Sequence, residues 1–336
     1  MDTFLSFIVA AVLAATPLLF GTLGEILTEK SGHLNLGVEG MMFMGGVAGL
    51  AGTFYYEKAT GGEPNALIAV IIGVACAFLC AMFGALIYSF LTITLRANQN
   101  VTGLALTTFG TGFGNFFGEI MGTAAGGYVS VGTVIKAAFN DGIPVLKDIP
   151  IIGKLLFGFS FFVYLAVAFA IILAYFLAKT RTGLNLRAVG ESPATADAAG
   201  INVTLYKYLA TCIGGGICGL GGLYIVMNTA NGTGGVWVHN SISGYGWLAV
   251  AIVIFATWSP IKAVICSLVI GSLSVLPYYY QIPFIHSAIY EIFPYLATVA
   301  VLIMIIFRKK KSNLPPASLG LAYFREERKQ TSHDHP

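Results

Sequence analysis

The chain has 336 residues, of which 57% are hydrophobic and only 10% are charged, and its mean hydropathy is +0.81. Soluble domains carry about 25% charged residues, so this composition excludes an ordinary soluble protein. It predicts an all-α polytopic membrane protein. The formal net charge of +3 does not indicate a nucleic-acid partner, because the basic excess lies in the tail 308–336, which holds seven Lys and Arg against three Asp and Glu.

Apolar runs long enough to cross a bilayer, about 20 residues each, recur along the chain. We expect about nine transmembrane helices, with eight to ten as the range. In chain order the expected spans are 4–27, 38–56, 65–94, 101–120, 157–179, 205–227, 246–258, 261–277 and 288–307. Together they form a single transmembrane domain, 1–307, followed by a basic cytoplasmic tail, 308–336.

Basic residues in short loops mark the cytoplasmic side of a membrane protein. The run RKKK at 308–311 predicts a cytoplasmic C-terminus, and counting crossings backwards places the segment 180–204 in the cytoplasm and the N-terminus outside. The segment 121–156 is then an outer cap, and we expect a short interfacial helix in it. The polar run 227–247 reads as an outer or re-entrant loop, with Trp237 and Trp247 as interfacial anchors.

A short helix is predicted within the cytoplasmic segment. Ser192 is a good N-cap, Pro193 suits the first helical position, residues 194–199 favour helix, and Gly200 suits the stop. Such a short helix is not stable alone and must pack against something. It is either an ordinary connector or a docking helix for a cytoplasmic partner.

Three stretches of the chain resemble one protein family. The cytoplasmic stretch GLNLRAVGESPATADAAGINV, 183–203, looks like the coupling loop of ABC-transporter permeases, and is most like the branch that imports branched-chain amino acids, simple sugars and nucleosides. The stretches GEILTEKSGHLNLGVEGMMFMGG, 24–46, and SGYGWLAVAIVIFATWSPIKAV, 243–264, are similar to two further segments of that branch. The resemblance covers roughly residues 8 to 307. The form of the first span is most like permeases for nucleosides of the guanosine type, with simple sugars or branched-chain amino acids as alternatives.

The resemblance implies the fold of type II ABC importer permeases, with broken, glycine-rich helices in a bacterial cell membrane. It implies ABC ATPase subunits, a second and different permease chain, and an extracellular substrate-binding lipoprotein as partners. No cofactor is implied, and ATP hydrolysis belongs to the ATPase. The residues that it assigns to ATPase coupling are Arg187, Gly190, Ser192, Pro193, Ala194, Ala198, Gly200 and Ile201.

Polar residues interrupt the first spans. Asn35 and Glu39 stand at positions i and i+4 beside two glycines, and they either satisfy broken backbone or line the path. Glu29, Lys30 and His33 are expected in a solvated loop, while Glu25 could pair with the Asn35–Glu39 cluster. Asn115 and Glu119 repeat the spacing among phenylalanines that could stack on a nucleobase. The candidate path residues are Asn35, Glu39, Gln99, Asn100, Phe113, Asn115 and Glu119.

Other functional classes lack sequence support. Metalloprotease, nucleophile-elbow and phosphate-loop motifs are absent, and the five cysteines lie in apolar runs without metal spacing, so neither an enzyme nor a metal site is expected. The run IGGGICGLGGLY, 213–224, reads as a helix-packing surface. An ion-coupled secondary transporter is the alternative of another class, with Glu39 and Glu119 as proton carriers, and it would need no ATPase.

Overall fold

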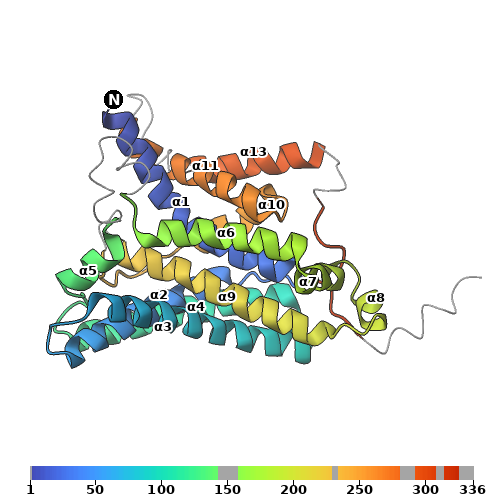
Figure 1. Cartoon of the computed structure of the whole chain (residues 1–336), viewed down its shortest axis with the longest axis horizontal. Coiled ribbons are helices and arrows are strands. Elements are labelled where there is room, and N and C mark those ends of the chain that lie inside the picture. Colours follow the sequence, from blue (N-terminus) through green and yellow to red (C-terminus); the bar gives the residue numbers. More distant parts are fainter. Residues whose placement is uncertain (1, 143–157, 229–233, 281–291, 308–313, 325–336) are drawn as a thin grey trace, which may run out of the picture.

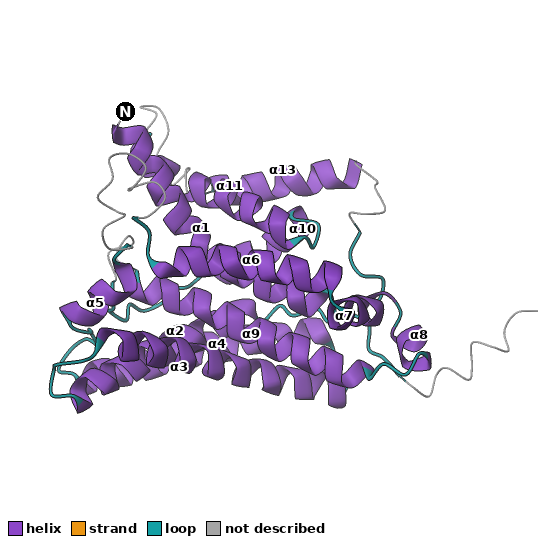
Figure 2. Ribbon diagram, in the orientation of Figure 1, coloured by secondary structure: helices purple, strands orange, loops and turns teal. Residues whose placement is uncertain are grey.

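The chain folds into a bundle of long helices in the computed structural model, which describes residues 2–142, 158–228, 234–280, 292–307 and 314–324. No strand occurs within these ranges, and the only sheet-like pairing there is an isolated bridge between Ser130 and Val236. Figures 1 and 2 show the long helices running side by side, with α5 at one end of the bundle and α7 and α8 at the other. The elements are α1 Asp2–Glu29, α2 Val38–Ala59, α3 Ala66–Ser89 continued by a π-helical turn η1 Phe90–Thr94, α4 Gln99–Ala124, α5 Thr133–Asn140, α6 Phe161–Lys179, α7 Arg181–Glu191, α8 Pro193–Ala198, α9 Val203–Met227, α10 Tyr245–Phe255, α11 Pro260–Tyr279 and α13 Phe293–Phe307.

The expectation of an all-α polytopic protein is confirmed. Among the described residues, five helical segments are long and apolar enough to cross a membrane: Thr3–Glu29, Ala66–Thr94, Phe161–Lys179, Val203–Met227 and Pro260–Tyr279. Each expected span contains a helix, but α10 has only 11 residues, and α2 and α4 carry glycine and polar side chains that lower their hydropathy. The expected starts of two spans, at 157 and 288–291, lie outside the described residues.

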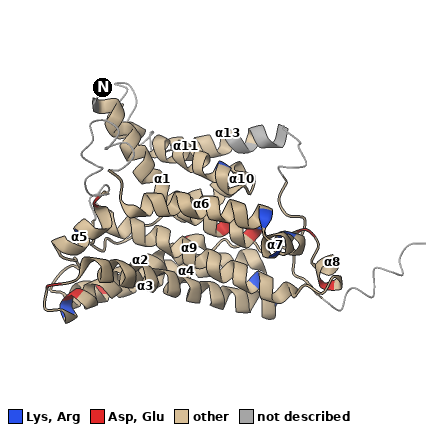
Figure 3. Ribbon diagram, in the orientation of Figure 1, with Lys and Arg blue, Asp and Glu red and all other residues tan. Residues whose placement is uncertain are grey.

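Charged side chains separate towards the two ends of the bundle. Figure 3 shows most Lys, Arg, Asp and Glu near α7 and α8 at one end and near the turn between α2 and α3 at the other, while most of the length between them is uncharged. This distribution fits a bilayer around the middle of the bundle. The basic run 308–311, on which the orientation depends, lies outside the described residues.

The centre of the bundle is built on backbone-to-backbone packing of α2 and α9. A Cβ at Gly219 would lie 2.8 Å from the carbonyl oxygen of Ala77 on α3, and one at Gly45 would lie 2.4 Å from Gly219 Cα. Small residues allow this approach, and every position of α9 from 214 to 227 is buried. The glycine-rich run 213–224 is therefore a helix-packing surface, as predicted.

The two segments expected on the outer side agree with expectation in part. Helix α5 lies in the segment 121–156 and confirms the predicted short helix, whereas 143–157 and 229–233 lie outside the described residues. The anchor prediction for Trp237 is wrong. Its side chain is 8% exposed and packs against Phe43 and Gly118, because the connection that carries it folds back into the bundle.

Candidate functional site

The connection 30–37 between α1 and α2 folds into the bundle, which overturns the solvated-loop prediction for Glu29 and His33. Glu29 is 2% exposed and accepts a hydrogen bond from the indole N–H of Trp258. His33 is 1% exposed, and its Nε2 lies 2.8 Å from Thr92 Oγ1. Lys30 is half-buried. Sequence polarity suggested contact with water, but partners from η1 and from the turn before α11 cover these groups.

Asn35 holds the turn that starts α2. Its backbone N–H donates to Glu25 Oε1 at 3.0 Å, which confirms that Glu25 belongs to this cluster. Its side-chain Oδ1 accepts from the N–H of Gly37 at 2.9 Å, the geometry of an Asx turn. Asn35 is fully buried, so these contacts favour the first of the two alternatives, satisfaction of broken backbone.

Glu39 joins the starts of two helices. It stands in the first turn of α2, and its Oε2 accepts from the N–H of Gly244, the N-cap of α10, at 3.0 Å. Helix α10 has no side-chain cap of its own, and Gly246 packs directly on the Glu39 backbone. A carboxylate at a helix N-terminus satisfies its orphan donors and complements the helix dipole. Glu39 therefore fixes where α10 begins.

Asn115 ties α4 to the second connection that returns into the bundle, 234–244. Its Nδ2 donates to Asn240 Oδ1 at 2.7 Å, and its Oδ1 accepts from the N–H of Asn240 at 3.1 Å. Asn240 has a left-handed backbone with φ of 58°. Sequence reasoning missed Asn240 and Gly244 as partners of Asn115 and Glu39, because only the return of this connection into the bundle brings them together.

An open groove runs along the outer side of α4. Seven α4 residues line it around a volume of about 750 Å³. Four phenylalanine rings form a row there, with centroid separations of 6.0 Å from Phe109 to Phe113, 4.5 Å from Phe113 to Phe117 and 5.3 Å from Phe117 to Phe116. Phe113 is half-buried there and Glu119 is exposed, while Asn115 points inward. Of the other two candidate path residues on α4, Asn100 is exposed. Gln99 is buried and accepts a hydrogen bond from the N–H of Leu34 at 2.8 Å. The groove residues are Ala105, Thr108, Phe109, Gly112, Phe113, Phe116 and Phe117.

The short helix predicted after Ser192 forms. Helix α8 begins at Pro193, the Ser192 side chain accepts from the N–H of Thr195, and Gly200 has a φ of +83°. Ala196 is buried in a small cluster with Val189 and Val203, so α8 packs on α7 and α9. Among the residues assigned to coupling, Gly190 is buried and Ser192, Pro193 and Ile201 are half-buried, whereas Arg187, Ala194, Ala198 and Gly200 are exposed.

The described part of the tail, 314–324, packs across this end of the bundle. Ser318 donates to the Gly190 carbonyl through both its N–H, at 3.0 Å, and its hydroxyl, at 2.6 Å. Tyr323 donates to Asp197 of α8 at 3.1 Å, and Gln99 donates to the Leu321 carbonyl at 3.4 Å. The basic residues of the tail lie outside the described ranges.

Comparison with known proteins decides the family. A family model for the permease component of branched-chain amino acid transport systems matches residues 7–307. The chain belongs to this family. The expected resemblance is thereby confirmed, and the chain is a multi-pass permease subunit of an ABC transporter, a transport component and not an enzyme.

Three relatives match over almost the full length of both chains. TsgC13 of Haloferax volcanii carries the provisional name of a glucose ABC transporter permease protein. It is 33% identical over 94% of this chain and 97% of its own. The guanosine ABC transporter permease protein NupQ of Bacillus subtilis is 32% identical over 96% and 98%. The nucleoside ABC transporter permease protein NupC of Lactococcus lactis is 31% identical over 96% and 98%.

Proposed function

We propose that this permease subunit forms the path by which an ABC importer brings nucleosides across the cell membrane. The supporting observation is the similarity to NupQ and NupC over nearly the whole chain, together with the nucleoside-permease form of the first span. A simple sugar is the second candidate, favoured by the similarity to TsgC13. Nine spans, a cytoplasmic C-terminus and an outer N-terminus belong to this proposal.

The solute path in this proposal runs between two permease chains, along the α4 groove. Glu119 supports this placement because it is an exposed carboxylate on a membrane helix, and such groups face protein or a wet cavity rather than lipid. Helix α4 rises about 1.5 Å per residue, which puts Glu119 roughly 8 Å from its outer end. The phenylalanine rings of the groove offer stacking surfaces, and Glu119 offers an acceptor for ribose hydroxyls.

The fixed junction of Glu39 with α10 and the Asn115–Asn240 pair lie behind this groove. They hold the connection 234–244 against α2 and α4. We assign them a positioning role: they set the shape of the path wall without touching the solute. Asn35 and Gln99 support the same wall from the α7–α8 end.

Helix α8 couples the path to the ATPase in this proposal. Ala194 and Ala198 are exposed on a helix whose other side is anchored by Ala196, so α8 can present a small, flat surface to a groove of the ATPase. ATP-driven closure of the ATPases then moves α8 and switches the permeases between inward-facing and outward-facing forms. An extracellular binding protein delivers the solute to the outer loops, and a second, different permease chain completes the path.

Nucleoside uptake tests the substrate. Cells lacking this chain are complemented with it, or with it and a partner ATPase whose catalytic glutamate is replaced, and uptake of labelled guanosine is measured with excess ribose or leucine as competitor. Uptake is expected only with the active ATPase and is expected to resist both competitors. Uptake that survives the dead ATPase contradicts ATP-driven import, and normal guanosine uptake without the chain contradicts the nucleoside assignment.

The substitution Ala198→Arg tests the docking role. It places a long cation on the exposed side of α8, so solute-stimulated ATPase activity is expected to fall while membrane insertion stays normal. The control is Ala188→Arg, which adds the same side chain at an exposed position of α7. Equal ATPase activity in the Ala198→Arg variant and the wild type would remove the coupling role from α8.

A further inference from the structure

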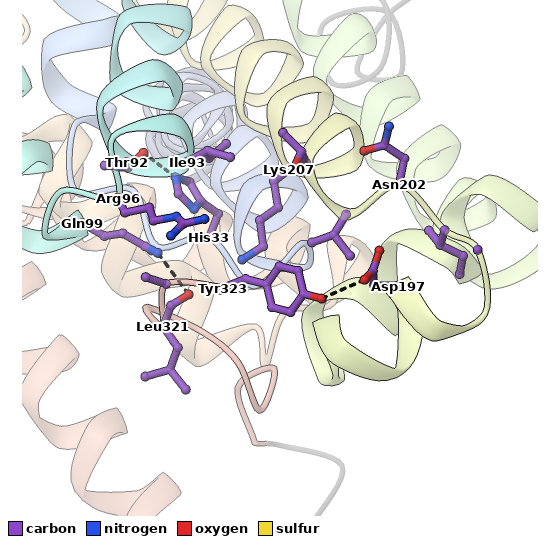
Figure 4. Close-up of a pocket in the computed structure, with 15 residues that line it drawn as sticks. His33, Thr92, Ile93, Arg96, Gln99, Asp197, Asn202, Lys207, Leu321 and Tyr323 are labelled. Atoms are coloured by element: carbon purple, nitrogen blue, oxygen red, sulfur yellow. Dashed lines mark hydrogen bonds between the residues drawn. The ribbon is translucent and has the colours of Figure 1, made fainter. Parts of the chain in front are cut away.

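A polar cavity, partly open to solvent, lies at the α7–α8 end of the bundle, apart from the α4 groove. Its volume is about 460 Å³, within the range of small-molecule sites. Its walls come from the connection 30–37, η1 and the turn that leads to α4, the start of α9, helix α8 and the docked tail. Figure 4 shows His33 and Arg96 on one side of this space and Tyr323 and Asp197 on the other.

Lys207 is the buried cation of this cavity. Its side chain is 3% exposed, it lines the cavity, and in Figure 4 it descends from α9 into the space between His33 and Tyr323. Within the described part of the chain, no carboxylate forms an ion pair with Lys207. Burial of a charge without a counterion is costly, so this ammonium calls for an anion in the cavity.

Other groups of the cavity favour the same kind of ligand. Val203 and Thr204 are the first two residues of the 25-residue helix α9, so their N–H groups have no intrahelical acceptor and stand at its positive end. Arg96 adds a second cation, held 4.6 Å above the ring of Phe324. Asp197 is the one carboxylate on the described walls, and it already accepts from the Tyr323 hydroxyl.

His33 adds no charge to the cavity. Its burial, and then the nearby Lys207 ammonium, lower the pKa of the imidazole to about 3, so the ring is neutral near pH 7. The charged groups around the cavity are thus two cations and one carboxylate, which is already hydrogen-bonded. The cavity has a net positive charge and donors on several sides.

We propose that this cavity binds a phosphate monoester or free phosphate, held by Lys207, Arg96 and the N-terminus of α9, with the tail residues 321–323 closing over it. A phosphate group accepts several hydrogen bonds at once and carries more charge than a carboxylate, which suits two cations and a helix N-terminus. The phosphate can come from a soluble cytoplasmic compound or from the headgroup of an anionic lipid, because Lys207 stands in the second turn of a membrane-spanning helix.

The tail gives this site a consequence beyond binding. The stretch 321–323 walls the cavity, and Tyr323 also holds Asp197 of α8. A bound phosphate therefore stabilises the docked tail and, through it, the position of α8. The site lies away from the solute path, and its existence does not depend on which solute is carried.

Binding and thermal melting test the proposal on the purified transporter in nanodiscs of phosphatidylcholine alone. Inorganic phosphate is titrated at constant ionic strength set with potassium chloride. The wild type is expected to bind phosphate, to melt at a higher temperature with it, and to show slower hydrogen exchange in 314–324. Lys207→Met should weaken binding at least tenfold, while Lys262→Met, which removes an exposed lysine at the start of α11, should leave it unchanged.

Lys207→Met also has a signature of its own. It removes an unpaired buried charge, so without phosphate this variant should melt at the wild-type temperature or above, and phosphate should not raise it. If this variant fails to assemble, Arg96→Gln, at an exposed residue, should weaken phosphate binding several-fold.

Phosphatidic acid in the nanodiscs distinguishes the two sources. Stabilisation by this lipid, absent in Lys207→Met and without any response to inorganic phosphate, assigns the site to a lipid headgroup. Stabilisation by inorganic phosphate in pure phosphatidylcholine assigns it to a soluble compound. The proposal is overturned if neither probe binds, or if phosphate binds equally to the wild type, Lys207→Met and Arg96→Gln.

Discussion

The crossing of α2 and α4 provides a pair of substitutions two residues apart with opposite expected effects. A Cβ added at Gly110 would lie 2.3 Å from the carbonyl oxygen of Gly40 and 2.4 Å from its Cα. A Cβ added at Gly112 would meet nothing within 4 Å. Both glycines lie inside α4, so Gly110→Ala and Gly112→Ala change the helix propensity equally and differ only in what the new methyl group contacts.

The size of the difference follows from these distances. Ordinary contact begins at 3.4 Å, so the Gly110 methyl group requires α2 and α4 to move apart by 3.4 − 2.3 = 1.1 Å. The atoms it meets are backbone, so no rotamer change relieves the overlap. Overpacking of this kind costs about 1–3 kcal/mol, whereas alanine for glycine within a helix stabilises by about 0.5–1 kcal/mol. Gly112→Ala should therefore stabilise slightly, and Gly110→Ala should be less stable than Gly112→Ala by about 1–3 kcal/mol.

Thermal unfolding of the detergent-purified chain measures this difference. At about 1.4 °C per kcal/mol for a chain of 336 residues, Gly110→Ala should melt below Gly112→Ala by about 1–4 °C. Uptake should fall with Gly110→Ala as well, because the α2–α4 crossing supports Glu39. Equal melting temperatures for the two variants would mean that α2 and α4 leave enough space for the added methyl group at position 110. The packing argument for this part of the bundle would then fail.

Two further predictions concern buried polar groups. Glu39→Ala leaves the N–H of Gly244 and the start of α10 without an acceptor, so the free energy of unfolding should fall by about 1–3 kcal/mol. Glu39→Gln keeps a side-chain carbonyl oxygen as acceptor and should lose less. Thermal unfolding measures both losses, and equal losses in the two variants would contradict the acceptor role of the side chain at position 39. Burial, and then the nearby Lys207 ammonium of α9, lower the pKa of the His33 imidazole to about 3. Thr92 of η1 and the Tyr88 ring of α3 also face the imidazole. Below about pH 6.5 the unfolded chain binds this proton and the folded chain does not, so stability should fall with acid by up to about 1.4 kcal/mol per pH unit until about pH 3. His33→Gln should flatten that slope in chemical unfolding at pH 5 and 7, and an unchanged slope would contradict the assignment.

Local signals in the sequence predicted local structure well. The caps of α8 could be read directly, because Ser192, Pro193 and Gly200 act within one or two turns of their own backbone. The packing role of the glycine-rich run in α9 could be read as well, since so many glycines in one apolar span have few other uses. Family membership also followed from three short stretches, since their order and spacing are jointly specific.

Long-range placement could not be predicted in the same way. Glu29 and His33 stand in a polar stretch that is typical of a solvated loop. They are buried only because the connection 30–37 turns into the bundle. Trp237 is of the residue type expected for an interfacial anchor, yet its side chain fills the space beside Gly118 of α4. The tail stretch 314–324 has neither helical periodicity nor charge, so nothing in it indicates docking on Gly190.

These long-range contacts form a continuous path from α8 to the start of α10. Tyr323 holds α8 through Asp197, and the tail is bonded to Gly190 through Ser318. Gly190 packs against the carbonyl of Lys30, in the connection that leads to Asn35 and then Glu39. Every step is a close contact or a hydrogen bond, and elements packed this closely do not slide independently. If an ATPase displaces α8 as proposed, the displacement reaches Glu39 through the connection 30–37, and the start of α10 follows because the N–H of its N-cap Gly244 is bonded to that carboxylate.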